Sequence, residues 1–466
     1  MPRVAVIGGG FSGLSTAWHL GQVGFNVTVL EASPRFGGRI ETGTFSTGDR
    51  YERGAAEFYD ITGSPALKNL VHALELPTRP MRASPYFVWK GTTLESKDGI
   101  RRALGDRAVD AMDAFWKKGL EHRPVEEFAE AGHPRDNEHP WSKMSFEKVL
   151  KEHLSDDVGR DFTAFQGHSD LATSPRMTNG TFGFDNLLID HPDYCKFYLL
   201  RDGNESLAKS LRGGNFEILH GAHVNRIAQN GSGFQVSFNG GKTLNADVVV
   251  VTVWPGKLGQ VEWSGKGLSE AVADHSRHCN YWTHYLRVTF LFKGRFWAAD
   301  FPEDYFVQDC FGGATVYDQS WLSETRGVLS WLLAGEEAKT LSELSDNEII
   351  RRVADSFPEA IKRKSHLGME ARVDRYMSGV SRQPGGLPLQ SFEDRHLPCG
   401  DPKLLFTGDY LYDATINGAY DSALWVANAI AEPHGRKILR PPPAKVAASA
   451  PPQVHNDSLP FFARRV

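Results

Sequence analysis

The chain contains 466 residues, of which 41% are hydrophobic and 11% aromatic, and its formal net charge is -5. Its length predicts two or three domains with large cores, and the small net charge without a dominant Lys/Arg cluster argues against nucleic acid as a partner. We therefore expect a globular protein of enzyme size whose partner is a small-molecule organic substrate.

The cysteine spacing and the lengths of the apolar runs indicate in which cellular compartment the protein is expected. The four cysteines, Cys195, Cys279, Cys310 and Cys399, lie far apart and form no CxxC pair, which argues against a zinc site, a disulfide framework or a dithiol redox centre. The N-terminus lacks the basic segment and long apolar core of a signal peptide. The most apolar run, residues 247 to 255, is too short to span a bilayer. We expect a soluble, cytoplasmic protein with no metal site and no transmembrane segment.

The N-terminal stretch VAVIGGGFSG carries the first motif. Residues Val4 to Ile7 form a short continuous apolar run, which is typical of a central parallel strand covered on both faces. Gly8, Gly10 and Gly13 follow in the spacing G-x-G-x-x-G. The first glycine permits a tight turn, the second lets the backbone approach a diphosphate, and the third lets the next helix pack close to the strand. The motif predicts a dinucleotide site at a helix N-terminus.

A helix and a second strand follow the glycine motif in the order that a dinucleotide site requires. Apolar residues recur at helical spacing from Leu14 to Leu20, and Gly21 and Gly24 precede a predicted strand over residues 26 to 30. Glu31 ends this strand, about 20 residues after the first glycine, where a carboxylate accepts hydrogen bonds from an adenosine ribose. A 2′-phosphate would be repelled at that position.

Residues 4 to 41 as a whole resemble the N-terminal signature of the FAD-dependent amine oxidase superfamily, which includes monoamine oxidases, L-amino acid oxidases, phytoene desaturases and protoporphyrinogen oxidases. The resemblance continues into ASPRFGGRIE, where the family's RxGGR segment lies along the diphosphate and ribityl chain of FAD. Two guanidinium groups and two residues without side chains suit a diphosphate. The FAD-binding residues implied in this stretch are Gly8, Gly10, Phe11, Ser12, Gly13, Glu31, Ala32, Arg35, Gly37, Gly38 and Arg39.

Two later segments extend the resemblance. Strands predicted between residues 216 and 253 are similar to the family's second FAD segment, in which Val224 matches the residue whose backbone binds adenine; an ordinary β-meander would give the same pattern. The stretch KLLFTGDYLYDATINGAYDSALWVANAIA is more specific. There the resemblance implies that Gly408 and Asp409 place a carboxylate on the ribityl hydroxyls. The following helix, with Ala419 near its start, would direct its N-terminus at the flavin.

These segments predict an α/β fold with a Rossmann-type FAD-binding domain and an interleaved α+β substrate-binding domain. We expect a discontinuous FAD-binding domain over residues 1–62, 196–257 and 396–433, and a substrate domain over residues 63–195 and 258–395. Residues 121–138 are interpreted as a solvated surface segment. Residues 434–466 are interpreted as a Pro/Ala-rich C-terminal tail without a core of its own.

The resemblance implies an FAD-dependent oxidoreductase that takes a hydride from an amine, or from a similarly activated C-H bond, of a small, largely apolar organic substrate. A single G-x-G-x-x-G motif follows a predicted strand, so we expect no separate nicotinamide site and assign reoxidation to O2 or another external electron acceptor. A flavin-dependent carbon-carbon desaturase or isomerase and a non-catalytic FAD-binding protein remain alternatives. The sequence gives no indication of the oligomeric state.

Two departures from the family pattern bear on the chemistry. Counting back from the FW pair at residues 296–297, the family's catalytic lysine falls on Arg287, whose planar, permanently charged guanidinium is not equivalent to an ammonium. We treat Arg287 as a candidate catalytic residue, with a surface or interdomain arginine as the alternative. In GAAEFYD, L-amino acid oxidases carry a carboxylate-binding arginine after the glycine, whereas this chain offers Glu57 there and Arg53 before the glycine. This difference disfavours an α-amino acid substrate.

A third departure lies in GDYLYDATING, which is shorter than the matching loop of monoamine oxidases and closer to the desaturase-like branch. Tyr412 is the candidate catalytic aromatic residue beside the flavin, and an ordinary buried tyrosine is the alternative. No cysteine matches the position of the family's covalent flavin link, so we expect non-covalent FAD.

Overall fold

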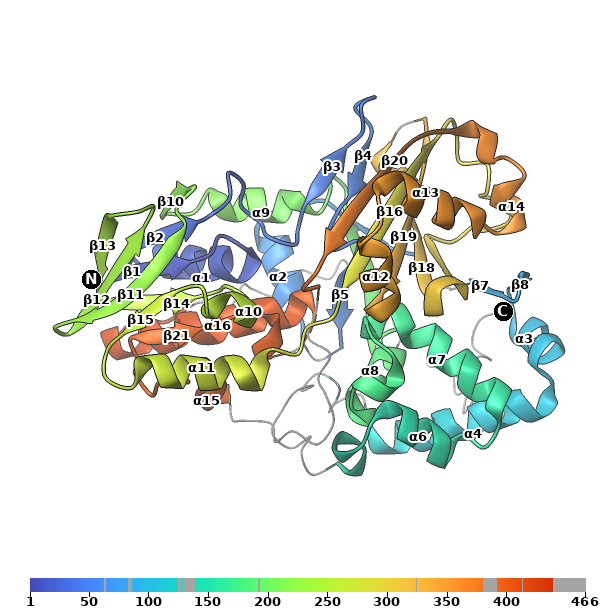
Figure 1. Ribbon diagram of the computed structural model, residues 1–466, viewed down its shortest axis with the longest axis horizontal. Helices are drawn as coiled ribbons and strands as arrows, with labels where there is room; N and C mark the ends of the chain where they lie inside the picture. The colour runs from blue at the N-terminus through green and yellow to red at the C-terminus, as the bar shows by residue number, and fades with distance from the viewer. Residues whose placement is uncertain are drawn as a thin grey trace.

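The computed structural model describes residues 1–62, 64–82, 86–124, 128, 139–191, 193–323, 325–379, 392–412 and 414–438. Most of the predicted surface segment at 121–138 and of the C-terminal tail at 434–466 therefore lies outside the described residues. Figure 1 shows two parts side by side. The left part in this view contains strands from the beginning, the middle and the end of the chain.

A five-stranded parallel sheet forms the centre of the left part. Its strand order is β10-β2-β1-β14-β21, and every neighbouring pair is parallel. The strands are β10 (Glu217–His220), β2 (Asn26–Glu31), β1 (Arg3–Ile7), β14 (Val248–Val251) and β21 (Leu404–Phe406). Every residue of β14 is buried, as expected for a strand with both faces covered. The strands predicted in the opening motif and around residue 250 are thus confirmed.

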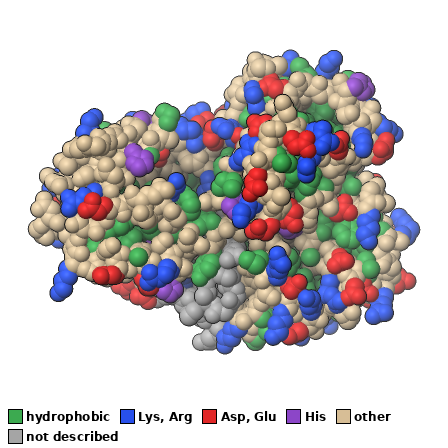
Figure 2. Space-filling view, in the orientation of Figure 1, with side chains coloured by type: hydrophobic (Ala, Val, Ile, Leu, Met, Phe, Trp, Pro, Cys, Tyr) green, Lys and Arg blue, Asp and Glu red, His purple; other side chains and the backbone are tan. Residues whose placement is uncertain are grey.

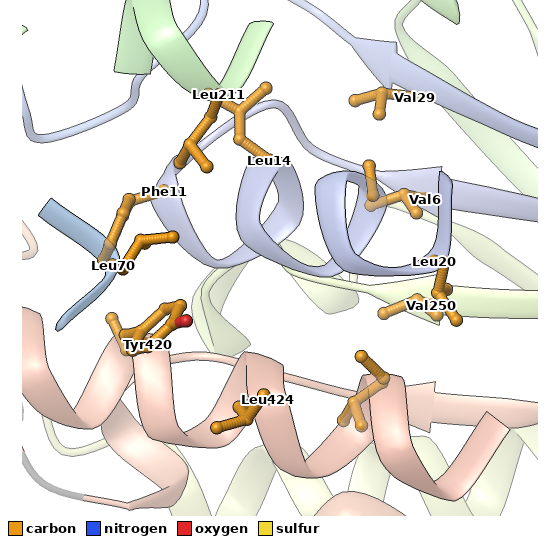
Figure 3. Packing of buried hydrophobic residues seen from close by; sticks show 14 of the residues in the cluster. Val6, Phe11, Leu14, Leu20, Val29, Leu70, Leu211, Val250, Tyr420 and Leu424 are labelled. Carbon is orange, nitrogen blue, oxygen red and sulfur yellow. The ribbon is translucent and has the colours of Figure 1, made fainter. Parts of the chain in front are cut away.

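Alternate residues of the parallel sheet enter two different cores. On one face, Val6, Val29 and Val250 pack against α1 (Phe11–Gln22), α9 (Glu205–Arg212) and α16 (Ile416–Ala431), as Figure 3 shows for Leu14, Leu211 and Leu424 from these helices. This arrangement is the helical cover that the apolar spacing after Gly13 predicted.

The opposite face of the parallel sheet packs against a second sheet. Ile7 and Val251 share a core with the sheet β13-β12-β11-β15 and with α11 (Leu268–Cys279). The strands of this second sheet are β13 (Lys242–Ala246), β12 (Gly233–Phe238), β11 (Val224–Asn230) and β15 (Glu262–Ser264). Leu268 and Val272 of α11 belong to this core, on the far side of the boundary expected at residue 257; the domain boundaries remain a prediction.

The right part is built on a seven-stranded sheet with helices on both faces (Figure 1). Its order is β20 (Gly368–Tyr376), β16 (Tyr285–Phe292), β19 (Gly327–Ala334), β18 (Ala314–Asp318), β17 (Tyr305–Gln308), β7 (Tyr86–Trp89) and β8 (Thr92–Leu94). One face packs on α4 (Asp106–His122), α6 (Phe146–His153), α7 (Asp157–Leu171) and α8 (Gly180–Leu188). The other packs on α12 (Gly335–Ser342) and α13 (Asp346–Asp355). Both long inserts contribute strands to this one sheet.

Short elements join the two parts: the sheet β5-β9-β6, with β5 (Phe58–Ile61), β9 (Cys195–Leu200) and β6 (Thr78–Pro80), and the pair β3 (Thr42–Thr44) and β4 (Arg50–Glu52). Helix α2 (Ala66–Ala73) follows β5 and packs on α16. On the face shown in Figure 2, acidic and basic side chains are interspersed over both parts. Within the described ranges, no helix is both long and apolar enough to cross a membrane.

Candidate active site

A cavity of about 1130 Å³ runs from the carboxyl ends of the parallel strands to the seven-stranded sheet. The crevice at the carboxyl ends of such strands is where α/β folds bind nucleotides. The cavity wall contains most of the predicted site residues, namely Gly8, Gly10, Phe11, Ser12, Glu31, Ala32, Gly38, Arg39, Val224, Gly408, Asp409, Ala419, Arg287 and Tyr412. Residues from distant parts of the sequence thus surround one space large enough for a dinucleotide and a small substrate.

The glycines of the opening motif make the turn at one end of this cavity. Gly8 has a φ of +110°, and a Cβ on it would lie 2.5 Å from Thr252 Oγ1. A Cβ on Gly13 would lie 2.1 Å from the carbonyl oxygen of Gly8. Helix α1 can therefore approach β1 only because residue 13 has no side chain, which is the role that the motif assigns to its third glycine.

The segment after β2 lies against the glycine turn. The N-H of Gly37 donates to the carbonyl oxygen of Gly9 at 2.8 Å, and a Cβ on Gly38 would lie 3.0 Å from Gly10 Cα. The guanidinium of Arg35 donates to the carbonyl oxygens of Gly38 and Ile40 at 2.9 and 3.0 Å. Arg35, Gly37 and Gly13 thus support the turn from behind, while Gly10 and Gly38 present bare backbone to the cavity.

Glu31 ends β2 beside the turn, as the motif predicts. Its Oε2 accepts a hydrogen bond from the N-H of Gly9 at 2.6 Å, and its Oε1 accepts one from the N-H of Ser33 at 2.8 Å. These two bonds fix the carboxylate at the cavity wall, between Leu30 and Ala32. Each carboxylate oxygen can still accept a further hydrogen bond, so the fixed group can receive a ribose hydroxyl.

Arg39 and Asp409 form an ion pair in the middle of the cavity. Two nitrogens of Arg39 donate to the two carboxylate oxygens of Asp409 at 2.9 and 2.6 Å, and Arg39 also donates to the carbonyl oxygen of Gly379. The guanidinium lies 5.9 Å from the centre of the Trp282 ring. The indole Nε1 of Trp282 is buried and lacks a hydrogen-bond partner among the described residues, so the cavity offers a donor that a bound molecule can satisfy.

The N-terminal end of α16 faces the same cavity. Thr415 caps this helix by accepting a hydrogen bond from the N-H of Gly418 at 3.1 Å, and the cavity wall includes Thr415, Ile416 and Ala419. The hydroxyl of Ser422 on α16 accepts a hydrogen bond from the N-H of Gly408 at 3.1 Å, which fixes the strand end before Asp409. The N-H groups of the first helical turn carry partial positive charge.

Glu57 stands at the other end of the cavity, within a cage of tyrosines. Its Oε1 accepts hydrogen bonds from the hydroxyls of Tyr59 at 2.9 Å and Tyr317 at 3.1 Å. Burial raises the pKa of Glu57, although Arg287 and the two tyrosine hydrogen bonds act in the opposite direction. Burial likewise raises the pKa of Tyr59 and of Tyr317 well above 10, so both hydroxyls remain neutral donors.

Arg287 projects from β16 into the wall beside Glu57 and is only 3% exposed. One terminal nitrogen donates to Ser330 Oγ at 3.1 Å, and the guanidinium lies 5.3 Å from the centre of the Tyr317 ring. Asp374 is its direct cross-strand neighbour on β20. The buried Nε of Arg287 has no hydrogen-bond partner among the described residues. Arg287 therefore lies in the cavity wall and not on the protein surface.

Asp170 completes the acidic end of the cavity. It lies in the last turn of α7, and burial together with Asp190 and Glu57 raises its pKa well above the ordinary aspartate value. The preceding residue, Ser169, is held by β16 because its carbonyl oxygen accepts a hydrogen bond from the Tyr285 hydroxyl at 2.7 Å.

Sequence reasoning named Glu57 only as a departure and missed Tyr59, Asp170, Tyr285, Tyr317 and Trp282. A signal for Tyr59 exists, because it follows Glu57 at strand spacing in GAAEFYD. Asp170 and Tyr317 carry no such local signal: they reach the cavity from α7 and β18, which meet only in the folded protein. The described residues contain no group of three or more His, Cys, Asp or Glu side chains arranged for a metal ion.

The residues on this cavity wall fit FAD. The bare backbone of Gly10 and Gly38, the cationic side chain of Arg39 and the N-terminal end of α16 suit an anionic dinucleotide. Glu31 suits its adenosine ribose, and the buried Nε1 of Trp282 has a hydrogen bond to offer that no described residue accepts.

A family model described as "Flavin containing amine oxidoreductase" matches residues 11–431. Polyamine oxidase 2 of Arabidopsis thaliana is 23% identical over 91% of this chain and 87% of its own length. The flavin-dependent L-tryptophan oxidase RebO of Lentzea aerocolonigenes is 23% identical over 93% of this chain and 99% of its own length.

Solved structures share the fold. Putrescine oxidase bound to putrescine superposes with a TM-score of 0.69 at 19% identity, covering 92% of this chain and 98% of that chain. Cyclohexylamine oxidase from Brevibacterium oxydans IH-35A superposes with a TM-score of 0.67 at 17% identity, covering 93% of this chain and 100% of that chain. The predicted α/β fold is thus confirmed. The chain belongs to the flavin-containing amine oxidoreductase family, and it is an FAD-dependent oxidoreductase.

Proposed function

We propose that this protein oxidises a cationic amine, taking a hydride from the carbon next to the nitrogen. The observation that carries the proposal is the division of charge along one cavity. The dinucleotide end offers Arg39 and the start of α16, whereas the opposite end offers Glu57 and Asp170. An acidic, tyrosine-lined compartment attracts an ammonium group and disfavours an anionic or wholly apolar molecule.

The surroundings of Arg287 favour an amine over an α-amino acid. An α-amino acid needs a free cation for its carboxylate. Arg287 is an electrostatic neighbour of both Glu57 and Asp374, so its charge is balanced by the protein itself. Arg287 therefore leaves no unbalanced positive charge for a carboxylate in this compartment. We therefore place this chain functionally nearer to the relatives named as polyamine oxidases than to the L-tryptophan oxidase, and we propose a polar, cationic substrate in place of a largely apolar one.

The chain's own groups would divide the work as follows. FAD, when bound, supplies the oxidant that accepts the hydride. Glu57 would hold the substrate nitrogen near the end of the cavity, and Tyr59 and Tyr317 would enclose it and exclude water. The N-terminal end of α16 would stabilise negative charge that accumulates on the cofactor side. Arg287 would favour the carboxylate form of Glu57 through its fixed positive charge, against the effect of burial.

For the second half of the reaction we propose O2 or an external electron acceptor, in the absence of a second dinucleotide motif in the sequence. The four cysteines, all within the described residues, are unpaired, which is compatible with the cytoplasmic location that we propose. A carbon-carbon desaturase or isomerase is the alternative function, because the short GDYLYDATING loop is closer to that of the desaturase-like branch.

The test is an anaerobic titration of the purified holoprotein followed by visible absorption. Butylamine, 1,4-diaminobutane, L-norleucine and 1-butanol form the panel. We expect the oxidised flavin band to bleach with one or both amines and to persist with the α-amino acid and the alcohol. A flavin that no amine bleaches would refute amine oxidation and favour the desaturase or isomerase alternative. Admitting O2 after bleaching then tests the acceptor, because rapid recovery of the band identifies an oxidase.

A further inference from the structure

The acidic end of the cavity favours the ammonium form of an amine, whereas amine oxidation requires the neutral form. A carboxylate beside an ammonium stabilises the charged form of the amine. Hydride loss from the neighbouring carbon requires the neutral amine, because the nitrogen lone pair must stabilise the developing positive charge. A site that attracts the ammonium through Glu57 therefore also needs a group that removes one of its protons.

The two carboxylates at this end of the cavity have opposite surroundings. Glu57 accepts hydrogen bonds from Tyr59 and Tyr317 and is close to Arg287, and all three favour its ionised form. Asp170 accepts no hydrogen bond from any described residue, and both of its charged neighbours, Asp190 and Glu57, are acidic. Burial raises the pKa of both acids, but only Glu57 has neighbours that favour its carboxylate, and two acids in such different surroundings can take divided roles.

The position of Asp170 strengthens this contrast. It lies in the last turn of the 15-residue helix α7, where the partial negative charge of the helix end disfavours a carboxylate and favours a cation. Ser169 is fixed by Tyr285 on β16 and by a hydroxyl contact to Thr315 on β18. Asp190, behind it, accepts a hydrogen bond from the Tyr305 hydroxyl at 2.7 Å. The backbone before Asp170 is thus fixed at the cavity wall, and no described residue donates a hydrogen bond to the Asp170 carboxylate.

A second orphaned polar atom lies in the same wall. Arg287 is 97% buried, and its Nε has no hydrogen-bond partner among the described residues. Among the described residues, the cage thus contains one unused donor on Arg287 and one carboxylate, Asp170, to which no hydrogen bond is donated.

We propose that Asp170 is the proton acceptor for the substrate's ammonium group, and that Glu57 is its anchor. The inference rests on the proposed amine oxidation. In this step one N-H bond of the ammonium breaks, its electron pair remains on nitrogen, and an O-H bond forms at a carboxylate oxygen of Asp170. The step consumes no oxidant, and it leaves the neutral amine from which the hydride departs.

The tyrosines near Asp170 and the arginine beside them are not suited to accept a proton from the substrate. The charged and titratable neighbours of Asp170 are Glu57, Asp190, Tyr59, Tyr285 and Tyr317. Arg287 is a charged neighbour of Glu57, Tyr285 and Tyr317. Burial raises the pKa of all three tyrosines, so their hydroxyls do not ionise near neutral pH, and a guanidinium has no lone pair for a proton. On α7 itself, His168 is directed to Glu337, 3.5 Å away.

The first test uses the wild-type holoprotein. The rate of anaerobic flavin reduction at saturating amine is measured against pH for butylamine and for a fluorinated butylamine, whose ammonium is more acidic. If Asp170 accepts the proton, the rate falls toward acid at the same pH for both amines, because that fall reports protonation of Asp170 in the complex. A fall that moves with the acidity of the amine would overturn the proposal.

The second test uses Asp170→Asn, with Asp161→Asn as the matched control on the exposed side of α7. We expect Asp170→Asn to reduce flavin about 100-fold more slowly near neutral pH. Its rate should then rise toward the pH at which the free amine deprotonates. Asp161→Asn and Asp170→Glu should keep the wild-type pH profile.

An unchanged rate and profile in Asp170→Asn would refute the role of Asp170 while leaving amine oxidation intact. Failure of every amine to reduce the wild-type flavin would instead refute the proposed function. If Asp170→Asn does not retain FAD, the two-amine comparison in the wild-type protein decides the question alone.

Discussion

Replacing Glu52 by glutamine tests the electrostatics of the junction between the two parts of the molecule. Glu52 ends β4 and is 0% exposed. Its Oε1 accepts a hydrogen bond from the N-H of Asn204 at 2.8 Å, and its Oε2 accepts one from Thr42 Oγ1 at 3.0 Å. Burial raises its pKa from 4.5 to about 8 in spite of these bonds. Glutamine has the same shape, and its amide can donate to the Thr42 hydroxyl.

The sign of the effect follows from proton linkage. Between pH 4.5 and about 8 the folded protein keeps a proton on Glu52 that the unfolded chain has released. Stability therefore falls as pH rises through this window. From pH 5.5 to pH 8.5 the wild-type protein should lose roughly 3 kcal/mol relative to Glu52→Gln, at about 1.4 kcal/mol for each pH unit. For a chain of 466 residues this is a difference of about 3 °C in Tm.

The assay is thermal unfolding of the holoprotein at several pH values, with Glu217→Gln on the exposed start of β10 as the control. We expect the Tm advantage of Glu52→Gln to grow from pH 5.5 to pH 8.5, while the control stays parallel to the wild type. A Tm difference that is constant with pH, or one that shrinks as pH rises, would refute the assignment of a buried, mainly protonated Glu52.

Three further substitutions test the cavity. Gly13→Ala places a Cβ 2.1 Å from the Gly8 carbonyl oxygen; we expect a loss of about 3 kcal/mol in unfolding free energy and of bound flavin absorbance, whereas Gly259→Ala, with open space around it, should be neutral. Equal stability of the two variants would contradict the close packing of α1 on β1. Glu57→Gln should weaken amine binding about 30-fold or more, measured as the amine concentration that half-bleaches the flavin, because a buried ammonium loses its charged partner; an unchanged titration would remove Glu57 from the site. Asp409→Asn removes the acid paired with Arg39, whose side chain is 43% exposed; with that solvent screening we expect FAD reconstitution about 10-fold weaker, and equal affinity would show that the pair is not needed for the cofactor.

The sequence predicts a structural feature well when that feature depends on residues that are close together in the chain. The glycine turn is set by neighbours within a few residues: Gly8 needs a positive φ and Gly13 needs contact with Gly8, so the motif predicts the turn in detail. Arg35 matched the same signature, but its guanidinium is directed to the carbonyl oxygens of Gly38 and Ile40. A motif fixes which residue stands at a position and does not fix the direction of a long, flexible side chain.

The acidic end of the cavity lay beyond sequence reasoning for a different reason. Glu57 directly precedes β5, Asp170 lies in the last turn of α7, and Tyr317 is near the end of β18. Their meeting depends on how both long inserts pack on one sheet, and no local spacing encodes it. The aromatic residues of these inserts also fill the cores on the two faces of that sheet, so composition alone could not separate a cage tyrosine from a core tyrosine.

The arrangement around Arg287 explains why the proton acceptor is found elsewhere in the cavity. Arg53 donates to Asp374 at 2.7 Å and also pairs with Glu41, so a line of alternating charges runs from the loop behind the dinucleotide site to the cross-strand neighbour of Arg287. Arg287 ends this line beside Glu57. A guanidinium in that position cannot release or accept a proton, so its contribution is a fixed positive charge that favours the carboxylate form of Glu57 against the effect of burial. We therefore assign proton transfer to Asp170, which lines the same compartment as Glu57 and is not among the groups that Arg287 stabilises.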